Sequence, residues 1–171
     1  MNACSEKLTE KDKIEYFRRS YTSVDGLWFM MIEDKFGFEE ALERDEAVWK
    51  VLPKIQARTL KQMMSLDRGL DGLQQAVAAR MDIEGYIFDL EKSERGFCLT
   101  VSRCPWQELM RKSGRRHISE RVSGIICQAE YSVWASEFDE DGAEKIGFER
   151  ETRICQGAEK CILKFERSRA E

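Results

Sequence analysis

Cysteine is the residue type in this chain with the most specific chemistry, and the chain has six of them. Two, Cys155 and Cys161, flank a short turn in the stretch "ETRICQGAEKCILKF". Thiolates bind zinc and iron–sulfur clusters, and an activated thiolate is also a nucleophile. The pair is therefore compatible with an ordinary hairpin or with one half of a metal site.

A third cysteine, Cys127, lies in a helix predicted over residues 117–138. In the last predicted strand Cys161, Leu163 and Phe165 share one face, because strand side chains alternate with a period of two. Lys164 and Glu166 take the other face, so we expect the face with Cys161 to point inward. If the hairpin packs on the helix, the thiols of Cys127, Cys155 and Cys161 come together.

Tetrahedral zinc needs a fourth ligand, and the sequence offers three candidates. Glu151 lies upstream on the same predicted strand, and Glu130 lies one helical turn from Cys127. Cys104, at the end of the first predicted hairpin, would instead complete four thiolates, a set that suits zinc or an iron–sulfur cluster.

The alternative for every cysteine is a buried free thiol, which is a common core residue. Cys4 and Cys98 fit this alternative best. Cys4 lies in a polar segment, and Cys98 lies on the strand face opposite Phe97, Leu99 and Val101. We therefore leave these two cysteines out of the candidate site.

Two residues are candidates for catalysis. His117 is the only histidine and follows the basic run "RKSGRR", where it is either a general base, a metal ligand or a solvated side chain. Cys104 precedes Pro105 at a strand-to-helix turn, where the N-terminus of a helix can lower the pKa of a thiol.

Aromatic and methionine side chains are concentrated in "GLWFMMIEDKF". Side chains of this kind form a core or the wall of an adaptable cavity. We take Trp28, Phe29 and Met31 as the candidate wall of a pocket for a small apolar or cyclic ligand.

The elements that position these residues follow from hydrophobic periodicity. The pattern predicts helices in the first half, a hairpin over residues 86–103, a short helix at Pro105, the long helix and a second hairpin over residues 144–167. This order predicts an α+β fold in which N-terminal helices pack on an antiparallel sheet of about four strands, with a long central helix. We place a helical region at residues 1–82 and a sheet domain at residues 83–167, together forming one compact unit.

Composition limits the partners. The hydrophobic content of 42% indicates a globular protein with a core, and the net charge of −4 disfavours a nucleic-acid partner. The sequence has no uncharged apolar stretch of roughly 18 residues and no apolar signal core near residue 1, so we expect no membrane partner. We therefore expect a cytoplasmic protein with reduced thiols.

The stretch "ICQAEYSVWA" followed by "ERETRICQGAEKCILKF" resembles the 4-vinyl-reductase domain, a small-molecule-binding module related to the fold of vesicle-tethering TRAPP subunits. Sensor members of that group bind zinc through a helix cysteine, a glutamate and two cysteines around a closing hairpin. The resemblance implies Cys127, Cys155, Cys161 and Glu151 as ligands. The offset of Glu151 differs by one position from the sensor pattern, and the cysteine spacing is shorter.

A wider set of motifs, over about residues 16–165, resembles a prokaryotic cytosolic family grouped with L-2-amino-thiazoline-4-carboxylate hydrolases. These motifs are "YTSVDGLWF", "EDKFGFEEALERDEAVWKVLPKIQAR", "SRCPW", "ICQAEYSVWASEF" and "RICQGAEKCILKF". The resemblance implies a hydrolase that opens a small cyclic C–N bond, through a metal with an open position or through Cys104.

The leading hypothesis is a small-molecule-binding protein with a structural, cysteine-ligated zinc site. Its alternative is the hydrolase, and an iron–sulfur cluster is the alternative cofactor. By analogy with the tethering subunits, a homodimer through the N-terminal helices is a further possibility.

Overall fold

The computed structural model describes residues 8–168 and confirms the α+β class. Within this part of the chain, six α-helices and one 3₁₀ turn accompany a four-stranded antiparallel sheet. In chain order the elements are α1 (Glu10–Phe36), α2 (Phe38–Trp49), α3 (Leu52–Met63), α4 (Leu70–Glu84), β1 (Ile87–Lys92), β2 (Gly96–Arg103), α5 (Pro105–Lys112), α6 (Arg116–Glu137), β3 (Ile146–Arg150), η1 (Ile154–Gln156) and β4 (Cys161–Arg167). No helix among the described residues combines the length and apolar character needed to cross a bilayer.

The chain divides into two compact units, Met1–Ala41 and Leu42–Glu171. This boundary falls inside α2 and differs from the expected division at residue 82. The physical reason is that α3 and α4 belong with the sheet: α3 contacts α4 and α6, while α4 contacts β2. The second unit therefore contains all four strands and five of the six cysteines.

In the first unit, α1 is one continuous helix. It runs without a break through Ser23 and Gly26, because single residues of these types lower helix stability without ending a helix. A capping box begins the helix: the Thr9 hydroxyl accepts from the Asp12 backbone N–H at 3.2 Å, and the Asp12 carboxylate accepts from the Thr9 N–H at 2.9 Å. Gly37 ends it with a positive φ of 90°.

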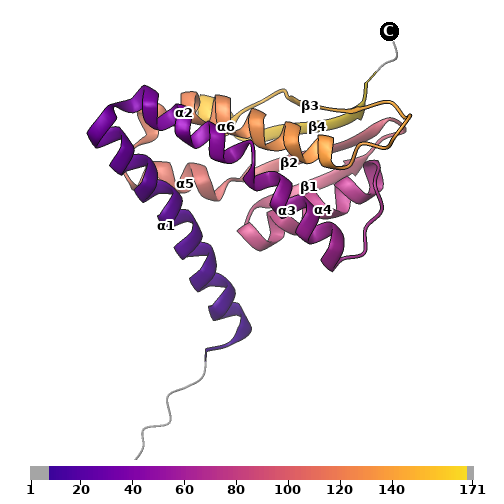
Figure 1. Ribbon diagram of the computed structural model, residues 1–171, viewed down its shortest axis with the longest axis horizontal. Helices are drawn as coiled ribbons and strands as arrows, with labels where there is room; N and C mark the ends of the chain where they lie inside the picture. Colours follow the sequence, from indigo (N-terminus) through magenta and orange to yellow (C-terminus); the bar gives the residue numbers. More distant parts are fainter. Residues whose placement is uncertain (1–7, 169–171) are drawn as a thin grey trace, which may run out of the picture. The chain divides into compact units, whose positions relative to one another are not determined.

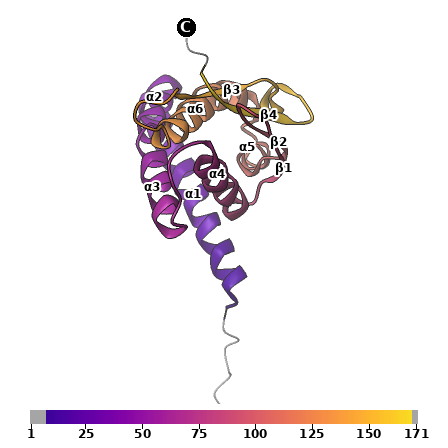
Figure 2. The same ribbon diagram turned by 90° about the vertical axis from the view of Figure 1, so that its right-hand side faces the viewer.

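In the second unit, the strand order is β1-β2-β4-β3, and every neighbouring pair is antiparallel. The two predicted hairpins are therefore confirmed, and the central pair joins them by placing Val101 opposite Cys161. Gly96 allows the two central strands to approach closely, because a Cβ there would lie 1.9 Å from the Phe165 carbonyl oxygen. Figures 1 and 2 show α4 and α6 beside the sheet, and their contacts with β2 and β3 agree.

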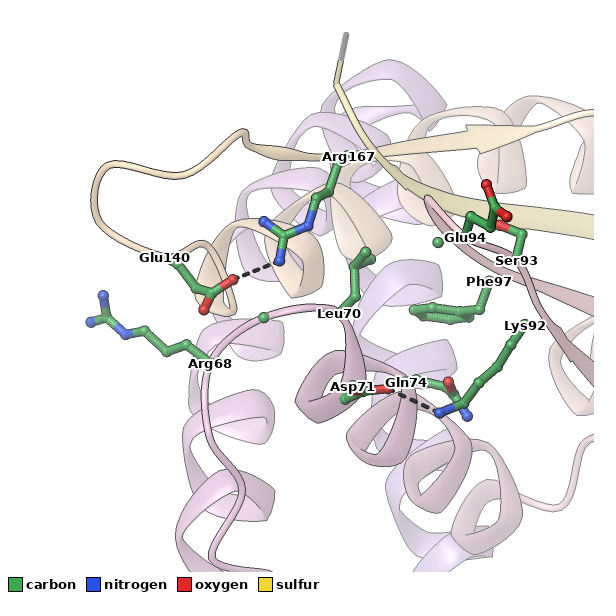
Figure 3. A pocket seen from close by; sticks show the side chains of 12 residues that line it. Arg68, Leu70, Asp71, Gln74, Lys92, Ser93, Glu94, Phe97, Glu140 and Arg167 are labelled. Atoms are coloured by element: carbon green, nitrogen blue, oxygen red, sulfur yellow. Dashed lines mark hydrogen bonds and ion pairs between the residues drawn. The ribbon is translucent and has the colours of Figure 1, made fainter. Parts of the chain in front are cut away.

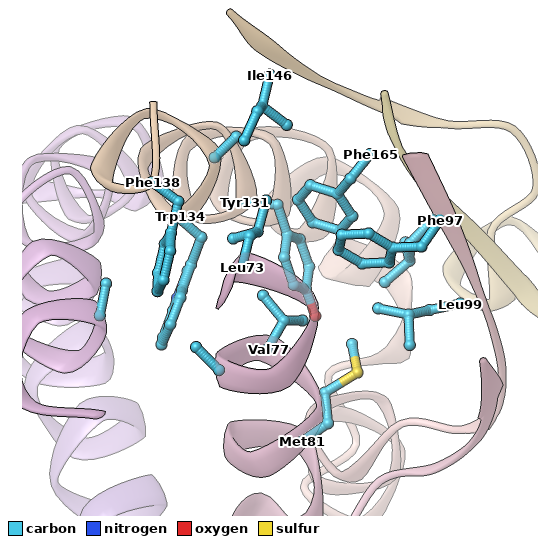
Figure 4. Close-up of a cluster of buried hydrophobic side chains, with 14 of the residues drawn as sticks. Leu73, Val77, Met81, Phe97, Leu99, Tyr131, Trp134, Phe138, Ile146 and Phe165 are labelled. Atoms are coloured by element: carbon cyan, nitrogen blue, oxygen red, sulfur yellow. The ribbon is translucent and has the colours of Figure 1, made fainter. Parts of the chain in front are cut away.

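The core of this unit lies between those helices and the inward face of the sheet (Figure 4). Phe97 and Phe165, on the two central strands, stack with their ring centroids 4.9 Å apart. The ring centroid of Tyr131, in α6, lies 5.0 Å from that of Phe148 and 6.0 Å from that of Phe165. This aromatic group fixes α6 against the sheet and so fixes the position of Cys127, one helical turn before Tyr131.

Candidate metal centre

Four cysteines reach the same end of the sheet from four different elements. Cys104 follows β2 and stands at the N-cap of α5, while Cys127 lies in α6. Cys155 lies in η1, which contacts α6, and Cys161 is the first residue of β4. Because β4 pairs with β2, the antiparallel register brings Cys161 near the end of β2 at which Cys104 lies.

The four sulfurs are electrostatic neighbours. Cys104 interacts with Cys127 and with Cys161, and Cys155 also interacts with Cys127 and with Cys161. Each thiol of this set therefore influences, or is influenced by, the ionisation of two others. We call Cys104, Cys127, Cys155 and Cys161 the thiol cluster.

Burial is the largest influence on the thiol cluster. It raises the pKa of Cys104 to about 11, the pKa of Cys127 well above its usual value and, to a smaller degree, the pKa of Cys161. The start of α5 acts on Cys104 in the expected direction, because the backbone N–H groups of Gln107 and Trp106 lower the pKa of its thiol. Burial has the larger effect, so the pKa of Cys104 is raised overall.

Polar hydrogens lie near two of the sulfurs. The Ile154 backbone N–H donates to the Cys161 sulfur at 3.1 Å. The Tyr86 hydroxyl and the backbone N–H groups of Gln107 and Trp106 each lower the pKa of Cys104 against the larger effect of burial. Such donors stabilise thiolates more than thiols. The donors thus favour the charged form that metal binding requires.

Among residues 8–168, no group of three or more histidine, cysteine, aspartate or glutamate side chains is already arranged to hold a metal ion. Of the two cysteines left out of the candidate site, Cys98 lies on the opposite sheet face, paired in register with Lys164. Cys4 lies outside the described residues.

The two candidate carboxylates have other partners. Glu151 forms an ion pair with Lys164, whose side chain lies on the outer face of the sheet. Glu130 is buried and its carboxylate lies 2.5 Å from the Arg80 guanidinium. Of the three candidates for a fourth ligand, the structure therefore favours Cys104.

A buried charged cluster lies beside the thiol cluster. Arg80 of α4, which is 3% exposed, donates through Nε and Nη2 to the two carboxylate oxygens of Glu84 at 3.0 and 2.9 Å. Glu130 of α6 is its second carboxylate partner, and the rings of Tyr86 and Tyr131 lie 6.0 and 5.5 Å from its guanidinium carbon. Arg80 therefore fastens α4 to α6 with its charge fully compensated.

A second buried arginine, Arg150, ends β3. It is opposite Leu163 in the register and so shares the inward face of the sheet with Cys161. Its Nη2 donates to the Ser123 carbonyl of α6 at 2.9 Å, while its Nε is buried without a hydrogen-bond partner. Its positive charge lowers the pKa of both Cys127 and Cys161, against the larger effect of burial.

The other predicted site residues lie elsewhere. His117 is exposed in the first turn of α6. In the first unit, Phe29 is buried and packs edge-on against Phe38 at 5.9 Å, whereas Trp28 and Met31 are exposed. None of the three expected wall residues lines the pocket of the second unit.

That pocket, of about 370 Å³, lies at the opposite end of β2 and β4 from the thiol cluster (Figure 3). Charged side chains dominate its lining, and most of them are paired: Lys92 lies 2.9 Å from Asp71, and Arg167 lies 2.8 Å from Glu140. Such a lining suits a polar ligand better than the expected apolar or cyclic one.

Neither buried arginine is among the predicted site residues, although the sequence carries a signal for the burial of each. Ile146, Phe148 and Arg150 alternate along β3, so the two-residue period assigns Arg150 to the inward face. Arg80 lies on the buried stripe of α4, four residues before Glu84, at the spacing of a helical ion pair.

A family model matches residues 5–150, which is most of the chain, and its description is "Family of unknown function (DUF6125)". The matched segment includes Cys104 and Cys127 and ends before Cys155 and Cys161. No curated protein and no solved structure gives a significant match. The chain belongs to the family of unknown function DUF6125.

Proposed function

We propose that this protein binds one zinc ion through the four sulfurs of the thiol cluster and that the metal is structural. The observation that carries the proposal is the convergence of Cys104, Cys127, Cys155 and Cys161, from four elements, on one end of the sheet. Four thiolates with no water are the usual ligand set of a structural zinc site.

The residues around the cluster support this ligand set. The Ile154 N–H donates to the Cys161 sulfur, and the Tyr86 hydroxyl and the first N–H groups of α5 favour the charged form of Cys104. Second-shell donors of this kind orient metal ligands and stabilise their charge. Zinc would displace the thiol protons and draw the four sulfurs in to about 2.3 Å from the ion.

The structural role follows from which elements the metal would join. Cys155 and Cys161 bracket the irregular segment between β3 and β4, while Cys104 and Cys127 belong to β2–α5 and α6. A metal held by all four would fix this segment to the centre of the fold. Its binding free energy would then contribute to folding free energy.

We place this function in the cytoplasm, where thiols stay reduced and available to a metal. Small-molecule binding stays a prediction. No observation favours the hydrolase alternative, because burial keeps Cys104 protonated at neutral pH and the single histidine is exposed.

Metal analysis of the full chain tests the proposal. Protein purified under reducing, oxygen-free conditions is expected to contain one zinc per chain, and chelation is expected to lower its melting temperature. Cobalt substitution is expected to give the visible spectrum of tetrahedral thiolate coordination. Iron with inorganic sulfide would overturn the choice of zinc, and failure to bind either metal would overturn the proposal.

Matched variants identify the ligands. Cys104→Ser and Cys127→Ser are expected to lose most zinc affinity, whereas Cys98→Ser on the outer sheet face is expected to retain it. Glu151→Gln is the decisive control for the fourth ligand. Loss of zinc in Glu151→Gln together with full retention in Cys104→Ser would assign the fourth position to the carboxylate instead.

A further inference from the structure

We propose that Arg150 is the built-in counter-charge of the thiol cluster, a positioning residue that favours the all-thiolate form of the zinc centre. This inference rests on the proposed zinc site. It adds a residue that lies outside the ligand set and a reason for the choice of four charged ligands.

The first observation is a buried positive charge without a carboxylate. Arg150 is only 6% exposed, and among residues 8–168 no aspartate or glutamate pairs with its guanidinium. Burying an ionised group is unfavourable unless an opposite charge compensates it. The Ser123 carbonyl supplies one hydrogen bond but no net charge, so the guanidinium has no direct ion-pair partner among the described residues. The nearest excess negative charge belongs to the Arg80 cluster, where two carboxylates share one arginine and Glu130 acts on Cys127 together with Arg150.

The second observation is the direction in which this arginine lies. Its backbone is opposite Leu163, two residues from Cys161 on the inward face of the sheet. Its Nη2 donates a hydrogen bond to the carbonyl of Ser123, which lies about one helical turn before Cys127. The guanidinium therefore lies among the elements that carry Cys127 and Cys161, and its buried Nε is a donor with no acceptor.

A zinc ion with four thiolates has a net charge of −2, so an all-thiolate centre needs positive charge around it. Arg80 is a poor source, because Glu84 and Glu130 already compensate it. Arg150 supplies both the uncompensated charge and a free N–H. When the thiols are protonated its charge is unfavourable, and when they become metal-bound thiolates it is favourable.

The test is Arg150→Met, which keeps most of the side-chain volume and removes the charge. Zinc affinity, measured by competition with a chelator, is expected to fall about 10- to 100-fold, the usual effect of losing an outer-shell partner. The melting temperature of the metal-free variant is expected to equal or exceed that of metal-free wild type. Arg150→Lys, which restores the charge, is expected to recover part of the affinity.

A purely structural arginine gives a different result. It predicts a lower melting temperature for Arg150→Met in both forms and unchanged zinc affinity, and that outcome would overturn the inference. Arg95→Met, at the pocket end of the sheet, is the control for zinc affinity and should leave it unchanged, whatever its own contacts with Glu144 and the Arg167 carbonyl contribute to the melting temperature. If wild-type protein binds no zinc, the zinc site itself fails, whereas normal zinc binding by Arg150→Met rejects only the role of Arg150.

Discussion

Two buried arginines in the second unit differ in whether carboxylates compensate their charge. Arg80 is held between two carboxylates, Glu84 and Glu130, and two tyrosine rings. Arg150 is buried almost as deeply, but its side-chain hydrogen bond goes to the neutral Ser123 carbonyl. Each guanidinium has one buried nitrogen without a hydrogen-bond partner, Nη1 in Arg80 and Nε in Arg150, so the contrast lies in the carboxylates alone. The first arginine has its counter-charges within the folded chain, while the second lies beside four thiols that can become anions.

The difference separates two uses of a buried charge. A compensated arginine contributes to the fold whether or not anything binds, because removing it strands its carboxylates. An uncompensated arginine costs stability until an anion forms beside it. The comparison therefore predicts that Arg80 supports the fold in every state, whereas Arg150 matters in the proposed metal-bound state.

Replacing Arg80 should have the largest effect on the metal-free protein. Arg80→Met leaves two carboxylates buried without a cation, and we expect a loss of about 3–5 kcal/mol in the free energy of unfolding. Urea unfolding of the metal-free protein measures it, with Arg150→Met as the matched comparison. Equal losses in the two variants would remove the distinction between the arginines.

Replacing one carboxylate of Arg80 should cost less. Glu84→Gln breaks the two-pronged contact but leaves Glu130 beside the guanidinium, so we expect a loss of about 1.5–3 kcal/mol by the same urea measurement. A loss as large as that of Arg80→Met would show that Glu130 contributes nothing to compensation.

The sequence predicted the scaffold of these two clusters better than the clusters themselves. Period-two alternation at Phe97, Leu99 and Val101 predicted the first hairpin and its inward face, and the structure confirms both. Alternation also predicted that Cys161 faces inward. These features are local, because each depends on residues close together in the chain.

The choice among fourth ligands depended on long-range register instead. Glu151 and Cys161 are close in sequence, but Glu151 pairs with Lys164 across the outer face. Cys104 is far from Cys161 in sequence, and only the pairing of β2 with β4 brings them together. Hydrophobic periodicity does not specify which strands pair, so the sequence left the fourth ligand open.

The domain boundary was also a long-range property. Hydrophobic periodicity predicts helix within residues 54–81 and gives no reason to separate them from the N-terminal helices. Their contacts with α6 and β2, which no periodicity encodes, place them in the second unit.

Tyr86 lies between the charged cluster around Arg80 and the thiol cluster. Removing its hydroxyl alone tests whether that group contributes to zinc binding as well as to folding stability. Its ring lies beside Arg80, and its hydroxyl lowers the pKa of Cys104. Tyr86→Phe keeps the ring, so we expect a loss of about 0.5–1.5 kcal/mol in unfolding free energy, together with weaker zinc binding. Unchanged zinc affinity would show that the hydroxyl serves only the fold.

The smallest effect is expected at an exposed arginine. Arg58 donates through Nε and Nη2 to the Glu137 carboxylate at 2.7 and 2.8 Å, and this hydrogen bonding lowers the pKa of Glu137. The stabilisation is present above the normal glutamate pKa and is lost as pH falls through the lowered value. Arg58→Met should therefore differ from wild type in urea midpoint at neutral pH and converge with it in acid. A difference that persists at the lowest pH would contradict this assignment.

The zinc content of the reduced full-length chain tests the central claim most directly. Titration of metal-free protein with zinc, followed by cobalt substitution, should give one metal per chain in tetrahedral thiolate coordination, and this signal should disappear in Cys104→Ser and persist in Cys98→Ser. A wild-type protein that takes up no metal, or one in which Cys104→Ser and Cys98→Ser behave alike, would contradict the account.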